Sequence, residues 1–483
     1  MLDVQLYFIT KIMEDGPSIL LINPYVRDFS AFDLWSKPLG LLYLAAVLRD
    51  NGYRVHLLDC LDAHFPGTET TASPNRRGAY GTGKYFRERQ PKPEVLRDVP
   101  RYYYRFGVPP ELFLKALQAL PEPAAVLVTS LMTYWYPGIS ETIGLIKQVF
   151  PGALVVLGGV YTGLMPDHAR EHSGADHIIT GEGEGAILNF LHDLTGWPLS
   201  ASPDPHNLDT YPFPAFDLYR RLDYNCLLTS RGCPFNCPYC ASRRLQPQFR
   251  ERSPGNIVAE IQHWHKLYGV RDFAFYDDAL LIHFEQRLGP VLERCLRENW
   301  AIRFHTPNAV HLREINPERA ALLYRGGFRT IRLGLETTDW RLQQSWGGKV
   351  NPDILREAVS ALKEAGFAAG NLEVYLLAGL PGQSVEDINH SILEAKKLGL
   401  GIRLSEYSPI PQTALWEEAC RTSRFTLEDE PLTHNNSLFP CLAPFSWETV
   451  QQLKDLAREK RTEDRGPRTE EQGLRTEDEG PRK

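Results

Sequence analysis

The sequence lacks the features of secreted, membrane-spanning and nucleic-acid-binding proteins. Its 53 lysines and arginines are outnumbered by 60 aspartates and glutamates, for a net charge of −7, so no overall basic field attracts nucleic acid. No apolar run reaches the roughly 18–20 residues that span a membrane, and residues 1–16 have no secretory pattern. Eight cysteines in 483 residues are too few for a disulfide framework. These absences predict a cytoplasmic protein without a membrane span or a nucleic-acid partner.

The composition is that of a globular protein, with 43% hydrophobic and 23% charged residues. A chain of this length predicts two or three domains. Alternating strand and helix patterns predict parallel sheets with right-handed crossovers. We expect a flavodoxin- or Rossmann-like domain over 17–195 and a partial barrel of six strand–helix units over 222–415. The strands are predicted at 18–23, 54–59, 124–130, 153–157 and 176–180, and then at 224–229, 272–276, 302–305, 330–335, 373–377 and 402–407.

Four other segments complete the predicted organisation. An insertion over 68–121 is basic and rich in tyrosine; it could pack against the sheet, cover a ligand face as a lid or contact RNA by stacking. Residues 196–221 form a proline-rich linker, and 416–458 form a small helical cap. The tail, 459–483, repeats Arg-Thr-Glu every seven residues with interspersed glycine and proline, which predicts disorder.

Three cysteines lie close together in the chain: Cys233, Cys237 and Cys240, with the spacing C-x3-C-x2-C. Gly232 and Pro234 favour a loop over a helix at this point. Soft thiolate ligands select zinc or an iron–sulfur cluster. A structural zinc site would need a fourth ligand, whereas a four-iron cluster on three cysteines keeps one iron open for chemistry.

With Tyr239 just before the last cysteine, this run resembles the signature of the radical S-adenosylmethionine (SAM) superfamily. The resemblance implies a [4Fe-4S] cluster on the three cysteines, whose open iron binds SAM and whose electron cleaves it to a 5′-deoxyadenosyl radical. It also implies an electron donor such as flavodoxin or ferredoxin, and a partial barrel that holds cluster, SAM and substrate at one mouth. A zinc knuckle is the alternative.

Glycines and hydroxyl residues follow three predicted strands of the first domain, where parallel sheets bind ligands. Glycine there lets the backbone approach a flat ligand closely. The residues are Ser130 and Thr133, Gly158 and Gly159, and Gly181, Glu182 and Gly183. This layout, directly before the cysteine motif, resembles the cobalamin (B12)-binding domain of one large class of radical SAM enzymes. It implies cobalamin as a further cofactor, with an empty flavodoxin-like domain as the alternative.

One histidine could mislead. Residues 62–67 match the pattern D-x-H-x-x-G, by which some cobalamin proteins supply a histidine to cobalt. In that pattern the loop follows the first strand, whereas here it follows the second. We therefore expect His64 to be a solvated loop histidine, and cobalamin to bind base-off without a protein nitrogen below the cobalt.

Candidate SAM contacts follow from the same resemblance. Asp277 and Asp278 end the second strand of the barrel, where the family binds the SAM amino group by a charge-assisted hydrogen bond; the commoner Gly-Gly-Glu form is absent. Gly334 and Glu336 end the fourth strand and are expected near the SAM ribose or amino group. Two segments of this chain, 379–382 and 409–413, resemble the loops that contact the adenine of SAM in this family. Helix capping or surface ion pairs are the alternatives for these acidic residues.

The resemblances together imply a cobalamin-dependent radical SAM enzyme. Its commonest reaction is methylation of an unactivated carbon, although relatives also carry out ring contractions and cyclisations. A tRNA methylthiotransferase is one alternative, but it needs three more cluster cysteines in its N-terminal domain, where this chain has only Cys60. A non-catalytic cobalamin and iron–sulfur sensor is the other. The substrate class stays open among small molecules, lipids and peptides.

Overall fold

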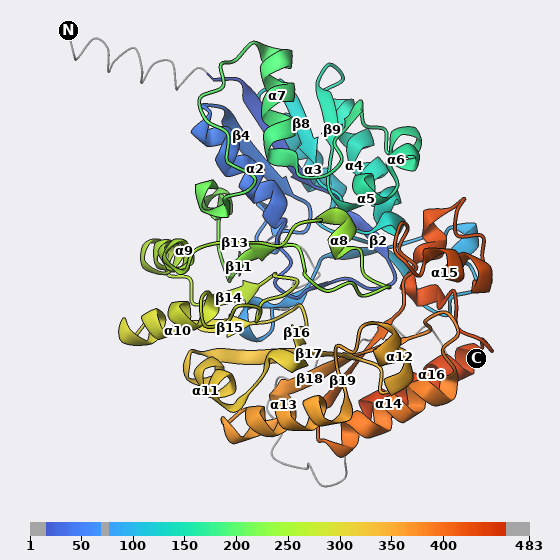
Figure 1. Cartoon of the computed structure of the whole chain (residues 1–483). Coiled ribbons are helices and arrows are strands. Elements are labelled where there is room, and N and C mark those ends of the chain that lie inside the picture. The colour runs from blue at the N-terminus through green and yellow to red at the C-terminus, as the bar shows by residue number, and fades with distance from the viewer. Residues whose placement is uncertain (1–15, 69–76, 460–483) are drawn as a thin grey trace. The chain divides into compact units, whose positions relative to one another are not determined.

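The computed structural model describes residues 16–68 and 77–459, which form two compact units (Figure 1). The described part of the first unit comprises 16–68, 77, 82–92 and 102–222, and that of the second comprises 78–81, 93–101 and 223–459. Within these residues no helix is long and apolar enough to cross a membrane. The predicted tail lies, from residue 460 on, outside the described residues.

The first unit is built on a parallel five-stranded sheet of order β10-β9-β8-β1-β4. Its strands are β1 (Ser18–Asn23), β4 (Arg54–Asp59), β8 (Ala125–Val128), β9 (Leu154–Leu157) and β10 (His177–Ile178). In chain order this is the flavodoxin-like arrangement 2-1-3-4-5, with the switch point between β1 and β8. The predicted fold class is confirmed, although β10 is only two residues long against the five predicted.

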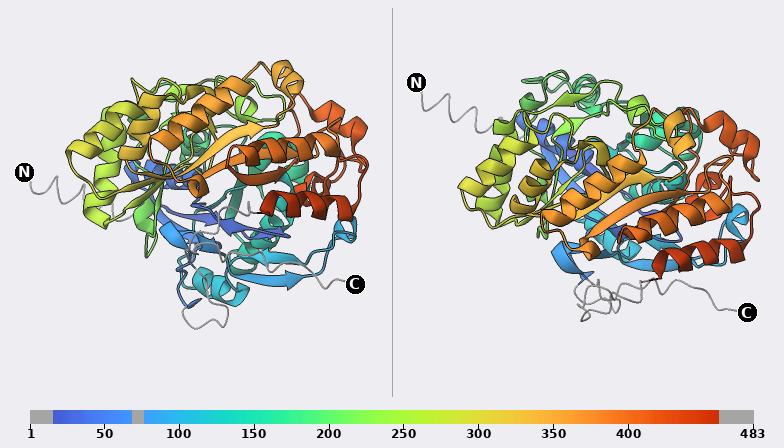
Figure 2. Two further views of the ribbon diagram at one scale, coloured as in Figure 1. Left: turned by 90° about the horizontal axis from the view of Figure 1, so that it is seen from below. Right: turned by 60° about the horizontal axis from the view of Figure 1, so that its bottom comes forward.

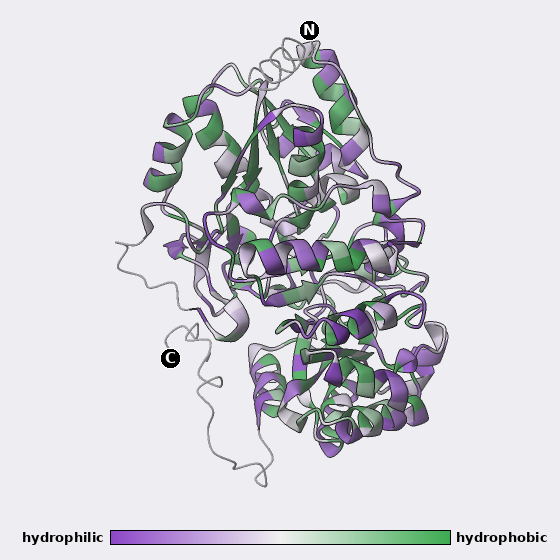
Figure 3. Cartoon of the chain, turned by 90° about the vertical axis from the view of Figure 1, so that its left-hand side faces the viewer, coloured by the Kyte–Doolittle hydropathy of each residue, from purple (hydrophilic) through white to green (hydrophobic). Residues whose placement is uncertain are grey.

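Helices cover both faces of this sheet (Figures 1 and 2). They are α2 (Leu39–Asp50), α3 (Pro110–Gln118), α4 (Tyr136–Val149), α5 (Val160–Leu164), α6 (Pro166–His172) and α7 (Gly183–Thr195). Alternate strand residues reach opposite cores: Leu20 packs with Ile139 of α4, whereas Leu21 packs with Leu48 of α2. Burial on both faces explains why these strands are continuous apolar runs, as the green strands of Figure 3 show.

The predicted insertion, 68–121, contributes the short strands β5, β6 and β7, whereas their partners β2 and β3 lie in the loop after β1. Short antiparallel strands pair as β2-β7-β6 and β3-β5, and Arg87 and Arg89 stack on Tyr104 and Tyr102 with 4.3 and 3.8 Å to the ring centroids. Arg105 pairs with Glu141 of α4 at 2.9 Å. Phe86, Val108 and Phe113 of the insertion share a core cluster with residues of β1, which supports packing against the sheet. The short strands are β2 (Val26–Asp28), β3 (Phe32–Asp33), β5 (Gly83–Lys84), β6 (Arg87–Gln90) and β7 (Tyr103–Phe106).

The second unit is a curved parallel sheet whose strands follow chain order, β11-β14-β15-β17-β18-β19, with β16 beside β17. The strands are β11 (Asn225–Leu227), β14 (Asp272–Phe275), β15 (Arg303–His305), β16 (Val310–His311), β17 (Phe328–Glu336), β18 (Leu372–Ala378) and β19 (Gly401–Glu406). Strand order that follows the chain is the order of a strand–helix barrel, and no pairing between β11 and β19 closes it in the described part. The predicted six-unit partial barrel is thus confirmed.

Helices pack along one side of this sheet (Figure 2). They are α9 (Pro254–Tyr268), α10 (Leu288–Arg297), α11 (Pro317–Arg325), α13 (Pro352–Glu364) and α14 (Val385–Lys397), with α8 (Ser242–Leu245), α12 (Trp340–Ser345), α15 (Trp416–Thr422) and α16 (Trp447–Arg458) in loops and cap. Local sequence starts several of them: Ser253 and Ser384 cap α9 and α14 through their side chains. A proline follows in the first turn of α9, where its missing N–H costs nothing.

Candidate functional site

The cysteine loop connects the two strands of a short antiparallel hairpin that precedes β14. Its strands are β12 (Ser230–Arg231) and β13 (Arg250–Glu251), with Ser230 opposite Glu251. Gly232 starts the loop at φ +84°, and a Cβ there would lie 2.5 Å from the carbonyl oxygen of Gln248. Only glycine fits this turn, so Gly232 allows the chain to leave β12 and enter the cysteine loop close to the Gln248 backbone.

The three cysteines are free thiols, half-buried at Cys233 and Cys237 and exposed at Cys240. Cys240 Sγ lies 3.1 Å from the Ser242 hydroxyl and accepts a hydrogen bond from the Ser242 amide at 3.4 Å. Burial raises the pKa of the Cys233 thiol to about 11, so iron binding there must displace a proton. In the described ranges, no group of three His, Cys, Asp or Glu side chains is close enough together to hold a single metal ion. A four-iron cluster does not require such a group, because each of its three cysteines binds a different iron.

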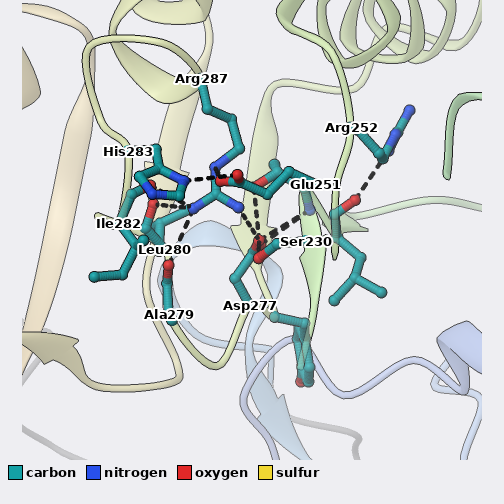
Figure 4. A network of polar contacts seen from close by, with 12 residues as sticks. Ser230, Glu251, Arg252, Asp277, Ala279, Leu280, Ile282, His283 and Arg287 are labelled. Atoms are coloured by element: carbon teal, nitrogen blue, oxygen red, sulfur yellow. Dashed lines mark hydrogen bonds and ion pairs between the residues drawn. The ribbon is translucent and has the colours of Figure 1, made fainter. Parts of the chain in front are cut away.

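The Asp277 side chain binds to the first strand of the hairpin and to the residue before it. Its carboxylate accepts hydrogen bonds from the Thr229 amide at 3.1 Å, from the Thr229 hydroxyl at 2.6 Å and from the Ser230 hydroxyl at 2.6 Å. Figure 4 shows this carboxylate beside Arg287, whose Nη1 lies 3.8 Å away. Asp277 is 2% exposed. Its oxygens are thus occupied within the protein, which favours Asp278 over Asp277 as the candidate SAM ligand.

Arg287 joins strand β13 of the hairpin to the segment after β14 (Figure 4). Its Nη2 donates to the carbonyl oxygens of Ala279, Leu280 and Ile282 at 2.8–3.0 Å, and its Nε lies 3.4 Å from Glu251 Oε1. His283 Nδ1 lies 2.7 Å from the other oxygen of Glu251. Sequence analysis missed Arg287, because nothing in a single sequence distinguishes it from other helix-end arginines.

Asp278 faces the cysteine loop from the carboxyl end of β14. Burial, assisted by the charge of Asp277, raises the pKa of Asp278 to about 6, whereas the Ser242 side chain lowers it. A buried carboxylate that is costly to ionise gains from a cationic ligand. An ammonium group bound near the cysteines would supply that cation.

Glu336 lies at the end of β17, in a left-handed conformation with φ +67°. A register shift between Gly334 and Glu336 turns the carboxylate into the unit, and a Cβ at Gly334 would stand 3.1 Å from Glu336 Oε1. Burial raises the pKa of Glu336, whereas Lys349 and the Tyr239 hydroxyl lower it. Lys349 Nζ lies 3.7 Å from Glu336 Oε1 and 3.8 Å from Cys237 Sγ. Two predicted residues, Tyr239 and Glu336, therefore meet at one buried lysine.

Sequence analysis missed Lys349 and His311. Lys349 follows two glycines after a short helix, a pattern that could have marked a turn carrying a single buried cation. His311, on β16, packs against Phe235 of the cysteine loop, with ring centroids 4.3 Å apart and the rings tilted by 41°. Burial lowers the pKa of His311 to about 3, with Lys349 and Arg313 contributing, so its imidazole is neutral.

The other barrel-end candidates lie in ordered loops. In the 379–382 loop, the Gln383 side chain accepts from the Gly379 and Leu380 amides at 3.0 and 3.2 Å. In the 409–413 loop, Gln412 has φ +67° and bonds to Arg244 of α8, just after the cysteines. The second loop thus touches the cysteine segment.

In the first unit, the three predicted loops lie together at the carboxyl edge of the sheet. The Ser130 hydroxyl donates to the Gly158 carbonyl at 2.6 Å, and the Ser130 carbonyl accepts from the Val160 amide at 3.0 Å. Thr133 is buried at the start of a 3-10 turn before α4. Glu182 is the N-cap residue of α7, which begins at Gly183, and Gly181 before it has φ +82°. His64 instead follows the edge strand β4, separated from β8 by β1.

The two adjacent glycines Gly158 and Gly159 have different structural needs. A Cβ at Gly159 (φ +105°) would lie 2.3 Å from the Ser130 carbonyl oxygen, whereas a Cβ at Gly158 meets only the Ile179 oxygen at 3.8 Å. We expect Gly158→Val to fold normally but to lower cobalamin affinity at least tenfold, because its methyls would occupy space that a flat ligand needs. Spectrophotometric titration with hydroxocobalamin measures this, with Gly144→Val as a helix-surface control. Equal affinities of Gly158→Val and the control would contradict it.

Two family models match the chain: the radical SAM superfamily over residues 227–395 and the B12-binding domain over 98–191. Among curated relatives, the uncharacterized methyltransferase PH0819 of Pyrococcus horikoshii is 27% identical over 56% of this chain, which spans 64% of that protein. The cytidylyl-2-hydroxyethylphosphonate methyltransferase of Streptomyces wedmorensis is 24% identical over 83% of this chain and 82% of its own length. The anaerobic magnesium-protoporphyrin IX monomethyl ester cyclase of Rubrivivax gelatinosus is 23% identical, over 58% of this chain and 55% of that one.

Solved structures share the fold. The radical S-adenosylmethionine methyltransferase TsrM from Kitasatospora setae, with cobalamin and a [4Fe-4S] cluster bound, aligns with a TM-score of 0.64 at 16% identity, covering 91% of both chains. The cobalamin-dependent radical enzyme OxsB aligns at 0.57 and 12% identity, covering 92% of this chain and 56% of that one. The cysteine loop lies within the radical SAM match, and the clustered glycine loops after β9 and β10 lie within the B12-binding match. This chain carries a B12-binding domain followed by a domain of the radical SAM superfamily.

Proposed function

We propose that the protein is a cobalamin-dependent radical SAM methyltransferase acting on an unactivated carbon. The observation that carries the proposal is the pairing, in one chain, of a B12-binding domain with a radical SAM domain whose three motif cysteines are free thiols on one loop. Three relatives named as methyltransferases support the methyl-transfer outcome.

The cysteine site fits the cluster by its donor set: three thiols on one ordered loop, with hydrogen-bond donors at two of the sulfurs. When bound, the cluster and SAM supply an electron and a deoxyadenosyl radical, and cobalamin supplies a transferable methyl group. The chain's own residues bind and orient: Cys233, Cys237 and Cys240 hold iron, and Asp278 holds the SAM ammonium. Ser130, Gly158 and Gly181, in the glycine loops of the first unit, hold the flat face of cobalamin.

The substrate is proposed to be a small molecule, a lipid or a peptide, and the reductant a flavodoxin or ferredoxin. Because three of the curated relatives are named as anaerobic cyclases, a cobalamin-dependent cyclisation is the second candidate. The two differ in the fate of the SAM methyl group, which reaches the product only in methyl transfer.

The test is anaerobic reconstitution with iron, sulfide and hydroxocobalamin, followed by SAM labelled at its methyl group and a strong reductant. We expect a four-iron cluster, equimolar cobalamin and release of 5′-deoxyadenosine. A preparation that contains the cluster yet releases no deoxyadenosine would overturn the radical step. Deoxyadenosine without bound cobalamin would remove methyl transfer and leave only the radical SAM activity.

A further inference from the structure

Lys349 is a buried cation that the local backbone directs into the cysteine site. It lies in the loop between α12 and α13, directly after Gly347 and Gly348 at φ +99° and +62°. The Gly348 amide donates to the Gln343 carbonyl at 2.9 Å, which closes the end of α12. On the other side, the Asn351 side chain caps α13 by accepting from two backbone amides. Lys349 is therefore held from both ends, and it is only 8% exposed.

The ammonium group of Lys349 faces three acceptors. They are Cys237 Sγ at 3.8 Å, the Tyr239 hydroxyl oxygen at 3.4 Å and Glu336 Oε1 at 3.7 Å. A lysine ammonium has three N–H groups and no acceptor, so these contacts match its donors in number. The cysteine loop and Glu336 thus set the position of the ammonium group.

The three cysteines differ in their donors. The Cys240 sulfur contacts the neutral hydroxyl of Ser242 and accepts a hydrogen bond from its amide, and the neutral backbone amide of Phe235 lowers the pKa of Cys233. Cys237 alone has a cationic donor among the contacts found in the described part of the chain. A charge-assisted hydrogen bond is roughly twice as strong as a neutral one. The charge at the cysteine site is thus concentrated on one sulfur.

We propose that Lys349 tunes the reduction of the cluster by stabilising the added negative charge at Cys237, and that Glu336 opposes it. The step is the uptake of one electron by the cluster from an external one-electron donor, with no proton transferred. Charge and hydrogen bonds at cluster sulfurs set the reduction potential, and a buried site screens them weakly. The inference rests on the proposed function, because it needs the cluster, but it needs neither SAM cleavage nor substrate.

The experiment compares variants of the full chain, loaded with cluster and free of SAM, in redox titrations followed by electron paramagnetic resonance. Lys349→Met keeps the length of the side chain and removes its charge. We expect its equilibrium constant for reduction to fall about tenfold, a shift of about −59 mV for a one-electron couple. Glu336→Gln removes the opposing carboxylate, so its equilibrium constant should rise. Lys349→Arg should stay within about threefold of the wild type, and Lys266→Met, an exposed lysine on α9, should not change.

Opposite shifts from the two substitutions are the signature of charge, because general loosening of the site would move both variants the same way. A Lys349→Met midpoint that corresponds to less than a twofold change would overturn the inference, as would shifts of equal sign. If Lys349→Met takes up no cluster, Glu336→Gln decides: an unchanged or lowered equilibrium constant refutes the inference. Failure of the wild-type chain to take up a cluster would instead refute the proposed function.

Discussion

Replacing Cys237 with alanine is expected to abolish reductive cleavage of SAM, with deoxyadenosine release falling at least a thousandfold. One of three thiolates is lost from a loop that offers no fourth cysteine within the motif, and the Lys349 ammonium loses the sulfur that it faces at 3.8 Å. A cluster held by two cysteines has two open irons, which favours its loss. Iron and sulfide content, together with deoxyadenosine measured by chromatography, check this result.

The matched control is Cys420→Ala, in α15. Cys420 is also a partly exposed free thiol of the same unit, but it lies outside the cysteine loop. It should retain wild-type iron content and cleavage. Cobalamin binding should be equal in both variants, because the glycine loops belong to the other unit. Deoxyadenosine at wild-type level from Cys237→Ala would refute the assignment of this residue.

Replacing Arg287 with methionine is expected to open the hairpin that carries the cysteine loop. The change leaves three carbonyl oxygens without their donor and removes the cation beside the buried Asp277. Loss of one partner from a buried charged network costs about 3–5 kcal/mol. Hydrogen exchange of peptides covering 229–251 should therefore accelerate by roughly a hundredfold or more, and iron content should fall with it.

Arg294→Met is the matched control, since Arg294 lies on α10, the helix that directly follows Arg287, but pairs with Glu298 at the surface, where it is half exposed. An exposed pair of this kind contributes about 0.3–0.5 kcal/mol, so exchange in 229–251 should not change. If Arg287→Met and Arg294→Met exchange at the same rate in this segment, Arg287 does not hold the hairpin. Loss of iron without faster exchange would point instead to an effect on charge alone.

Local patterns were sufficient to predict the fold. The apolar run at Ser18–Asn23 has no polar alternation, which is typical of a strand buried on both faces. Ser384 and Asp387 form a capping box that starts α14, a signal contained in four consecutive residues. Strand ends were less accurate: β10 has two residues where five were predicted, because pairing with a neighbour, and not apolar character, decides where a strand stops.

Some residues of the candidate site could be predicted from the sequence, and others could not. Cys233, Cys237 and Cys240 could be proposed from sequence because their spacing within one loop is itself the signal. The two aspartates could not be separated, since Asp277 and Asp278 are adjacent and equally acidic. Their different roles come from contacts of Asp277 with Thr229 and Ser230, 48 and 47 residues away. A preference between such neighbours is a tertiary property.

The sequence by itself determined the two-domain α/β architecture, the cysteine loop and the glycine loops, because each depends on residues close together in the chain. Only the tertiary structure decided that Asp277 secures the hairpin, that Arg287 joins it to the loop after β14, and that Lys349 lies against Cys237. Lys349 and Cys237 are 112 residues apart. Periodicity and spacing report local conformation, whereas burial of a charge and the identity of its partner arise only when distant segments pack together.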